Sequence, residues 1–280
     1  MIAFLGMGHL GANFVKALLR NGHQVQVWNR TYEKASALEA DGAKPFQNIE
    51  DAVKGADRVH ITLKDDASVD EMLAKAAGAL KPGCFIIDHT TTSVEGAVER
   101  TQNWAAKGFT YVHAPVFMGP QNALESTGTM LVSGNQDTLS TVTPMLDQMT
   151  GKVLNFGDTL GRAAGMKLLG NMFLIAVTGG LSDCLALAKS LNIPFDNVHQ
   201  LFGSWNPAAM IPARLNKITS ESFDQPTWEL HMARKDARLM VEAAQKGDML
   251  LHVIPSVAAL MDEWIAKGFS GSDWTIIGKV

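Results

Sequence analysis

The feature that most constrains this chain is a glycine-rich loop near its start, which lies between two stretches of different periodicity. Residues 2–5 are a short apolar run, typical of a buried strand. Residues 9–20 carry apolar side chains at helical spacing and are followed by Asn21-Gly22, a typical helix end. The loop between them has the spacing G-x-G-x-x-G and is formed by Gly6, Met7, Gly8, His9, Leu10 and Gly11. A strand, this loop and a helix in succession predict the first unit of a dinucleotide-binding sheet.

Each glycine of the loop has a separate physical role in such a site. The first permits a tight turn, the second lets a pyrophosphate approach the backbone, and the third lets the helix pack closely on the strand. The start of the helix offers free N–H groups and a partial positive charge to the phosphates. We therefore predict that the six loop residues bind a dinucleotide cofactor.

The end of the second strand indicates which dinucleotide is bound. Residues 25–28 have strand periodicity and are followed by Asn29, Arg30 and Thr31, with Lys34 one turn further on. A site that prefers NAD carries Asp or Glu here to bind the ribose 2′-hydroxyl, and that acid would repel a 2′-phosphate. Arg30 can instead bind the phosphate through two hydrogen bonds and stack on adenine. These residues predict NADP(H) as the cofactor.

The rest of the chain alternates between strands and helices and then becomes helical. Further strand-like runs occupy residues 59–63, 85–88, 109–113 and 130–133, with helical stretches between most of them. Residues 161–193 form one long, largely apolar helical stretch, and later helical stretches occupy residues 195–205, 211–219, 227–246 and 255–267. Alternation of this kind predicts a mostly parallel sheet covered by helices.

The predicted fold is therefore α/β with two domains joined by a long interdomain helix. Residues 1–158 are predicted to form an NADP-binding Rossmann domain, and residues 159–280 an all-helical domain for substrate binding and dimerisation. We expect the ligand site in the cleft between them.

Composition excludes several other classes of protein. The chain has 24 Lys and Arg against 28 Asp and Glu, with no basic block, so nucleic-acid binding is not expected. Cys84 and Cys184 lie far apart in apolar runs, so we expect small buried side chains and neither a disulfide framework nor a metal cluster. The histidines lack metal-ligand spacing, so no metal is expected. We found no apolar stretch long enough to span a bilayer and no signal peptide, which predicts a soluble cytoplasmic protein.

Four further motifs identify a family that the chain resembles. They are Asp88-His89-Thr90-Thr91; Ala114-Pro115-Val116 with Gly119 and a later Gly128-Thr129-Met130; Gly161-x-x-x-Gly165-Met166-Lys167-x-x-x-Asn171; and Lys235-Asp236-x-x-Leu239. Together with the glycine loop, they resemble the β-hydroxyacid dehydrogenase family of the 6-phosphogluconate dehydrogenase superfamily. That family includes 3-hydroxyisobutyrate dehydrogenase and the glyoxylate and succinic semialdehyde reductases. The resemblance covers nearly the whole chain.

The resemblance implies roles for particular residues. Lys167 and Asn171 match the catalytic stretch and also contact the substrate in the family. Thr91 is implied near both nicotinamide and substrate, and Leu63 and Lys64 in the loop beside the nicotinamide. The family uses the lysine that matches Lys235 near the cofactor. The resemblance also implies a homodimer or homotetramer.

The chemistry of Lys167 can be argued from the residues alone. Lys167 and Asn171 are four residues apart on one helical face, among apolar neighbours. Adding hydride to a carbonyl requires a proton donor at the developing alkoxide, and an ammonium group supplies both the proton and electrostatic stabilisation. Asn171 can orient the lysine or bind the substrate hydroxyl.

One segment departs from the family pattern. Where the family commonly reads Ser-Gly-Gly and holds a substrate carboxylate, this chain has Phe117, Met118 and Gly119. We expect these residues to bind substrate through an apolar pocket wall, while backbone N–H groups could still bind a carboxylate.

The sequence therefore predicts an NADPH-dependent reductase that converts a small aldehyde or keto acid to a hydroxy acid or alcohol. Two alternatives remain. Residues 27–31 also resemble those of imine reductases, although these usually carry Asp or Tyr where Lys167 stands, and a cationic lysine would repel an iminium. The altered segment at Phe117 and Met118 also suits a non-catalytic sensor that holds NADP without turnover.

Overall fold

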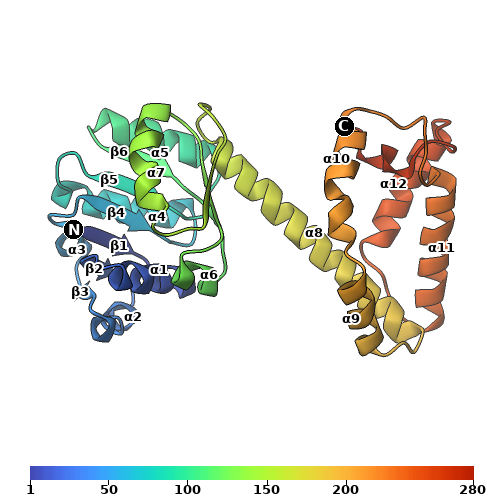
Figure 1. Ribbon diagram of the computed structural model, residues 1–280, viewed down its shortest axis with the longest axis horizontal. Helices are drawn as coiled ribbons and strands as arrows, with labels where there is room; N and C mark the ends of the chain where they lie inside the picture. The colour runs from blue at the N-terminus through green and yellow to red at the C-terminus, as the bar shows by residue number, and fades with distance from the viewer. The chain divides into compact units, whose positions relative to one another are not determined.

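The computed structural model describes residues 1–280, which form two compact units, Met1–Asn171 and Met172–Val280 (Figure 1). The division lies within a helix, 13 residues beyond the predicted boundary at residue 158. The last strand ends at Asn155, and the chain that follows stays packed with the first unit until Asn171.

A six-stranded parallel sheet forms the centre of the first unit, with strand order β3-β2-β1-β4-β5-β6. Its strands are β1 (Ile2–Leu5), β2 (Val25–Trp28), β3 (Lys44–Phe46), β4 (Arg58–Ile61), β5 (Phe85–Asp88) and β6 (Thr110–His113). The connecting helices are α1 (His9–Arg20), α2 (Tyr32–Ser36), α3 (Ile49–Val53), α4 (Asp66–Ala76) and α5 (Val94–Ala106). The strand order reverses beside β1, and open parallel sheets bind ligands at the carboxyl ends of their strands at such a point.

Alternating side chains of the strands enter two separate hydrophobic clusters. Phe4 and Val27 belong to the first cluster, with Phe14 of α1. Leu5 and Ile61 belong to the second. Because successive side chains of a strand point to opposite faces, both faces of the sheet are covered, as the sequence predicts for a buried parallel sheet.

A smaller sheet was not foreseen. It has the order β7-β8-β9 and consists of β7 (Val116–Phe117), β8 (Thr129–Val132) and β9 (Lys152–Asn155), with α6 (Pro120–Glu125) and α7 (Gln136–Leu146) between them. The apolar run at residues 130–133 therefore lies in a second sheet and not in the large one. Both β7 and β3 escaped prediction because they have only two and three residues, and Pro45 lies inside β3.

The second unit is helical, as predicted. The long helix α8 (Arg162–Ser190) begins in the first unit and continues into the second, which also contains α9 (Phe195–Ser204), α10 (Ile211–Thr219), α11 (Leu230–Lys246) and α12 (Ile254–Ala266). Short 3₁₀ turns occupy Pro207–Met210 and Trp274–Gly278.

Two buried carboxylates organise this unit. Asp183 accepts backbone hydrogen bonds at 2.8–2.9 Å from residues 252–254 and so satisfies the amino end of α12. Asp273 is fully buried and accepts from Lys217 Nζ at 2.6 Å and from the Thr227 backbone N–H at 2.8 Å. These contacts join segments that are 46 to 71 residues apart in the sequence.

Helix α8 corrects two expectations from the sequence, one about membrane spans and one about Cys184. By length and composition alone, α8 could cross a membrane, which the sequence reading had excluded. Its exposed large apolar side chains include Met172, Phe173, Leu174, Ile175, Val177, Leu181 and Leu185. Cys84 is buried as expected, whereas Cys184 is exposed on α8.

Candidate functional site

The glycine loop connects β1 to α1, and steric contacts explain two of its three glycines. Gly6 has φ +99°, and a Cβ there would lie 2.1 Å from the Thr62 carbonyl oxygen. A Cβ on Gly11 would lie 2.0 Å from the Gly6 carbonyl oxygen. Beside Gly8 there is open space, so a ligand can approach the backbone there.

The backbone at the start of α1 is available to an anion. Gly8 is the N-cap residue and no side chain caps the helix. Asn29 fixes the loop against the end of β2, because its Oδ1 accepts from the Met7 N–H at 2.9 Å and its Nδ2 donates to the Thr31 carbonyl at 2.9 Å. This arrangement suits phosphate binding at a helix N-terminus.

A cavity of about 550 Å³ opens at the carboxyl ends of the central strands. It is lined by eight of the predicted cofactor residues: Gly6, Gly8, Asn29, Arg30, Thr31, Lys34, Leu63 and Lys64. Met7, His9, Leu10 and Gly11 do not line it, and neither does Thr91. Segments that are about 60 residues apart in the sequence thus meet in one polar cavity.

Several lining residues were missed by the sequence reading, among them Trp28, Thr62, Asp65, Ser68 and Glu71. Asp65 and Ser68 form a reciprocal capping box at the start of α4, with both backbone-to-side-chain bonds at 3.0 Å. The D-x-x-S pattern ahead of a helical stretch is the signal that could have revealed them. Thr62 Oγ1 donates to the Gly6 carbonyl at 2.8 Å. No local sequence pattern predicts this contact.

The loop after β5 exposes one residue of its motif. Asp88, Thr90 and Thr92 are buried, whereas Thr91 is exposed. Asp88 Oδ1 accepts from the Thr90 N–H at 2.9 Å, and Thr90 Oγ1 accepts from the Leu63 N–H at 3.0 Å. On the other side of Thr91, Thr92 Oγ1 lies 3.2 Å from His113 Nε2. Hydrogen bonds therefore hold the loop on both sides of Thr91 and connect it to Leu63 in the cofactor cavity.

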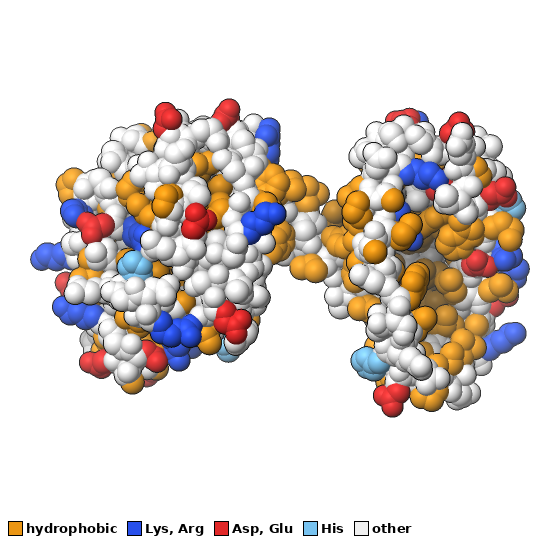
Figure 2. Space-filling view, viewed as in Figure 1, with side chains coloured by type: hydrophobic (Ala, Val, Ile, Leu, Met, Phe, Trp, Pro, Cys, Tyr) orange, Lys and Arg blue, Asp and Glu red, His pale blue; other side chains and the backbone are white.

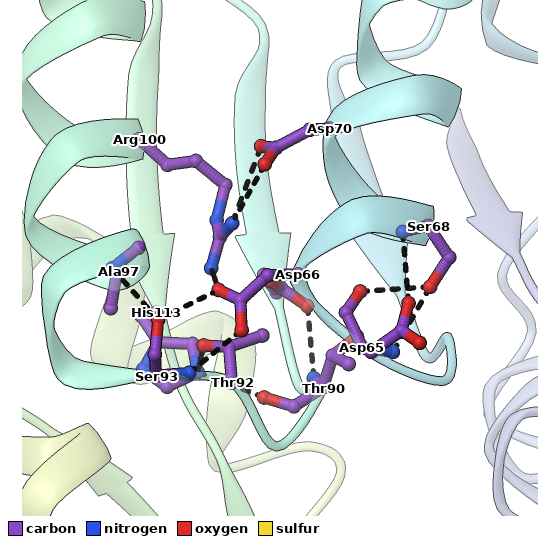
Figure 3. A network of polar contacts seen from close by, with 12 residues as sticks. Asp65, Asp66, Ser68, Asp70, Thr90, Thr92, Ser93, Ala97, Arg100 and His113 are labelled. Carbon is purple, nitrogen blue, oxygen red and sulfur yellow. Dashed lines mark hydrogen bonds and ion pairs between the residues drawn. The ribbon is translucent and has the colours of Figure 1, made fainter.

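A buried guanidinium links the two ends of this loop (Figure 3). Arg100 Nη2 donates to Asp66 at 2.6 Å, and the same carboxylate accepts from the Ser93 backbone N–H at 2.9 Å. On its other side, Arg100 Nε donates to the Tyr111 hydroxyl at 3.0 Å, which in turn donates to Asp88 Oδ2 at 2.6 Å. Burial and the charge of Asp88 raise the pKa of Tyr111 well above its ordinary value, so the phenol remains a donor.

Two buried histidines lie beneath the same loop. His89 Nδ1 lies 2.8 Å from the Ala114 carbonyl and must donate to it, so His89 Nε2 accepts from His60 Nδ1 at 2.9 Å. Both rings stack near Phe4. Burial lowers the pKa of His89 to about 4 and holds that of His60 well below its ordinary value, so both rings are neutral at pH 7.

The lowered histidine pKa values predict acid sensitivity of the first unit. In the unfolded chain, His89 takes up a proton below about pH 6.5, whereas in the folded chain it does so only when the pH falls to about 4. The unfolding free energy therefore falls as the pH is lowered through this window. Between pH 7.5 and 5 we expect a loss of about 2 kcal/mol in unfolding free energy from His89 alone. Urea unfolding of the chain and of His89→Gln at both pH values measures this loss. An equally steep loss in the variant would contradict the assignment.

The third part of the site lies at the start of α8. Lys167 Nζ donates to Asn171 Oδ1 at 3.0 Å and lies 4.2 Å from the centre of the Phe117 ring. The lysine is half-buried, and burial lowers its pKa from the ordinary 10.5. A Cβ on Gly170 would lie 2.2 Å from Phe117 Cζ, so this glycine makes room for the ring against α8. An ammonium over an aromatic face is stabilised by the ring quadrupole.

The neighbours of Phe117 differ from the sequence expectation. Met118 packs against the first hydrophobic cluster and lies close to Gly128, where a Cβ would come within 2.8 Å of its Cγ. Backbone N–H groups here could have bound a substrate carboxylate, but that of Gly119 donates to Asn122 Oδ1 at 2.9 Å. Of the three residues, Phe117 is the one whose ring lies against Lys167.

Lys235 belongs to the second unit. It lies on α11, where its Nζ is 3.0 Å from Asp236 Oδ1, and its side chain is 43% exposed. Lys235 is therefore paired with its neighbour Asp236.

These features define a class of protein. A parallel sheet with this strand order, a glycine loop after β1 and a cavity at the strand ends make up a Rossmann-type NAD(P)-binding domain. Residues 1–157 match the family described as the NAD binding domain of 6-phosphogluconate dehydrogenase, and the chain belongs to this family.

Relatives match along almost the whole chain. The 3-sulfolactaldehyde reductase of Escherichia coli is 27% identical over 285 residues, which cover 99% of this chain and 94% of the relative. The 2-(hydroxymethyl)glutarate dehydrogenase of Eubacterium barkeri is 23% identical and covers 100% of this chain and 94% of its own. Both relatives are oxidoreductases by name.

The two-unit fold also occurs in solved structures. An imine reductase from Myxococcus stipitatus in complex with NADP⁺ superposes with a TM-score of 0.91 at 20% identity, covering 99% of this chain and 98% of the other. This likeness establishes the fold, including the helical second unit.

Proposed function

We propose that the chain is an NADPH-dependent reductase that converts a small aldehyde or keto acid to a hydroxy acid or alcohol. The observation that carries the proposal is the half-buried Lys167, hydrogen-bonded to Asn171 in a chain whose Rossmann unit belongs to a dehydrogenase family. The direct test is NADPH oxidation with short aldehydes.

The proposed chemistry divides between cofactor and protein. When bound, NADPH supplies the hydride that reduces the carbonyl carbon. Lys167 donates a proton to the carbonyl oxygen, and its positive charge stabilises the developing alkoxide. Asn171 holds the ammonium through its Oδ1 and leaves an amide N–H₂ group for the substrate. Thr91 is the exposed hydroxyl proposed to contact nicotinamide and substrate.

The residues of the 550 Å³ cavity fit a dinucleotide. The glycine loop and the uncapped start of α1 would hold the pyrophosphate, and Arg30 and Lys34 would hold the 2′-phosphate. Arg30 forms no ion pair, whereas the two acids in the same cavity are paired, Glu71 with Lys75 at 2.7 Å and Asp65 with Lys64 at 3.6 Å. The cation at the end of β2 therefore supports NADP(H) over NAD(H).

Replacing Arg30 with alanine is expected to weaken NADPH binding by tenfold to several hundredfold, because charge-assisted hydrogen bonding to the 2′-phosphate worth about 1.5–3 kcal/mol is lost. NADH binding is expected to change little. Fluorescence titration with both cofactors measures the change, and Lys107→Ala, which removes an exposed cation elsewhere in the first unit, is the matched control. Equal weakening for both cofactors would argue against a 2′-phosphate contact.

The relatives' names support an acidic substrate, since sulfolactaldehyde and hydroxymethylglutarate both carry an anionic group. The local geometry favours an aromatic surface next to the lysine, because Phe117 lies under Lys167 and the Gly119 N–H is already bonded. We propose that Lys167 itself provides the positive charge that such a substrate meets.

Imine reduction is the second candidate function, since the aromatic face at Phe117 also suits an uncharged amine product. It requires an iminium beside the Lys167 ammonium, and like charges repel strongly where water is partly excluded. Holding NADP without turnover, as a sensor, is the third. Both would appear as NADPH binding without aldehyde reduction.

We further propose that a second copy of the chain covers the apolar surface of α8. Figure 2 shows hydrophobic side chains gathered on the second unit. Within α8, buried Asp183 accepts three N–H groups from the start of α12, which supports a helix that belongs to the helical unit over one that crosses a bilayer. Exposed apolar residues continue on other helices, including Phe195, Leu201, Leu215 and Leu239. Exposed apolar surface of this kind is typical of an interface.

The wild-type chain is expected to sediment as a dimer, and Ile175→Glu as a monomer, because a charge would be buried at the interface. Ile175 is 73% exposed in the single chain. Leu250, which is 72% exposed but lies outside α8, gives the matched control Leu250→Glu. Sedimentation of the wild type as a monomer, or its recovery with lipid vesicles, would contradict the proposal.

The two unpaired cysteines support a reducing, cytoplasmic location.

A further inference from the structure

A buried arginine lies at the amino end of a central strand, whereas the cofactor cavity lies at the carboxyl ends of the strands. Arg58 is the first residue of β4 and is only 8% exposed. Its Nε and Nη2 atoms are buried without a hydrogen-bond partner, and it forms no ion pair. A buried charge without a partner is among the costliest features a fold can carry.

The two unpartnered nitrogens form one edge of the guanidinium. Elsewhere in the chain, Arg234 uses the same Nε and Nη2 atoms to hold both oxygens of Asp262, at 2.7 and 2.9 Å. Parallel hydrogen bonds from this edge match the spacing of oxygens in carboxylates and phosphates. Arg58 carries the same planar guanidinium, a group suited to binding an oxyanion.

A cavity of about 410 Å³ lies at this place, at the amino ends of β1, β4 and β5. Arg58, Asp57, Lys81 and His23 contribute its polar lining. Lys81 Nζ is paired with Asp57 at 2.5 Å, and His23 Nε2 is hydrogen-bonded to Gln148 at 2.8 Å. The carboxylate is thus already neutralised, and the positive charge of Arg58 remains unbalanced.

We propose that this cavity is a second binding site, which takes a small oxyanion, a carboxylate or a phosphate, beside the guanidinium of Arg58. The anion neutralises the buried guanidinium. The site is separate from the cofactor cavity, because the glycine loop follows the carboxyl end of β1 whereas Arg58 lies at the amino end of β4.

Isothermal titration of the full chain in chloride buffer with inorganic phosphate, and separately with acetate, tests the proposal. Saturable binding that depends on Arg58 is expected for at least one of the two, and the comparison identifies the preferred oxyanion. Arg58→Leu is expected to weaken this binding about 100-fold through loss of the guanidinium charge and its hydrogen bonding. Arg58→Lys retains the charge but lacks the planar guanidinium, and is expected to weaken binding about tenfold.

Two control variants separate this site from others. Arg30→Gln removes the cation of the cofactor cavity, and Lys152→Gln removes an exposed cation on β9. Lys152→Gln is expected to bind the anion as the wild type does, and Arg30→Gln is expected to retain the binding that Arg58→Leu loses. Binding that survives in Arg58→Leu and disappears in Arg30→Gln would place the phosphate in the cofactor cavity and overturn the proposal. The absence of saturable binding in the wild type would overturn it as well.

Discussion

Replacing Lys167 with alanine is expected to lower kcat for aldehyde reduction by about 10²- to 10⁴-fold, because the proton donor and its charge are both lost. NADPH binding is expected to persist, since the glycine loop and Arg30 are unchanged. Lys189 lies on the same helix, is exposed and gives the matched control Lys189→Ala. Steady-state kinetics with NADPH and a turned-over aldehyde measure both variants. Wild-type kcat in Lys167→Ala would remove this lysine from the mechanism.

The pH profile of kcat tests the same residue by an independent route. Burial lowers the pKa of Lys167 from 10.5, and only the protonated ammonium can donate. Activity should therefore be present below this lowered pKa and fall as pH rises through it. The alkaline limb is expected to be absent from the residual activity of Lys167→Ala.

Replacing Arg100 with methionine is expected to lower the unfolding free energy of the first unit by about 3 kcal/mol, because breaking a buried pair leaves its partners uncompensated. Arg100 is 3% exposed; it donates to Asp66 (Figure 3) and also to the Tyr111 hydroxyl. Urea unfolding measures the loss. Arg238→Met is the matched control, because its pair with Glu242 is exposed and is expected to contribute less than about 0.5 kcal/mol.

The same substitution has an expected functional signature. Arg100 holds both ends of the loop that presents Thr91, so its loss should weaken NADPH binding more than binding of adenosine 2′,5′-bisphosphate, which lacks the nicotinamide half. Arg100→Lys, which keeps a cation, is expected to recover part of the difference. Equal effects on both ligands would mean that Arg100 serves stability alone.

Much of the large sheet could be predicted from the sequence, for a physical reason. The strands β1, β2 and β5 are buried on both faces and so appear as short apolar runs, and α1 has a clear apolar face. Short or exposed strands leave no such signal, as β3, β7 and β9 show. Apolar surface is equally ambiguous, since α8 is apolar although most of its large side chains are exposed.

The candidate site divides in the same way. Residues that depend on local backbone geometry, such as Gly6 and Arg30, appear in short motifs and line the cavity together. Residues that act through distant partners leave no pattern. Thr62 supports the glycine loop from β4, and Arg100 reaches both ends of a loop from α5. The bonding of the Gly119 N–H to Asn122 likewise became visible only in three dimensions.

The central claim is most directly tested by NADPH oxidation with short aldehydes, half of them bearing a carboxylate, using the wild-type chain and NADH as the comparison cofactor. The account predicts turnover with aldehydes, faster with NADPH than with NADH. Turnover confined to uncharged aldehydes would indicate that the substrate binds against the apolar surface of Phe117. If NADPH binds but no aldehyde in the panel oxidises it, the account is contradicted, whether or not imines are reduced.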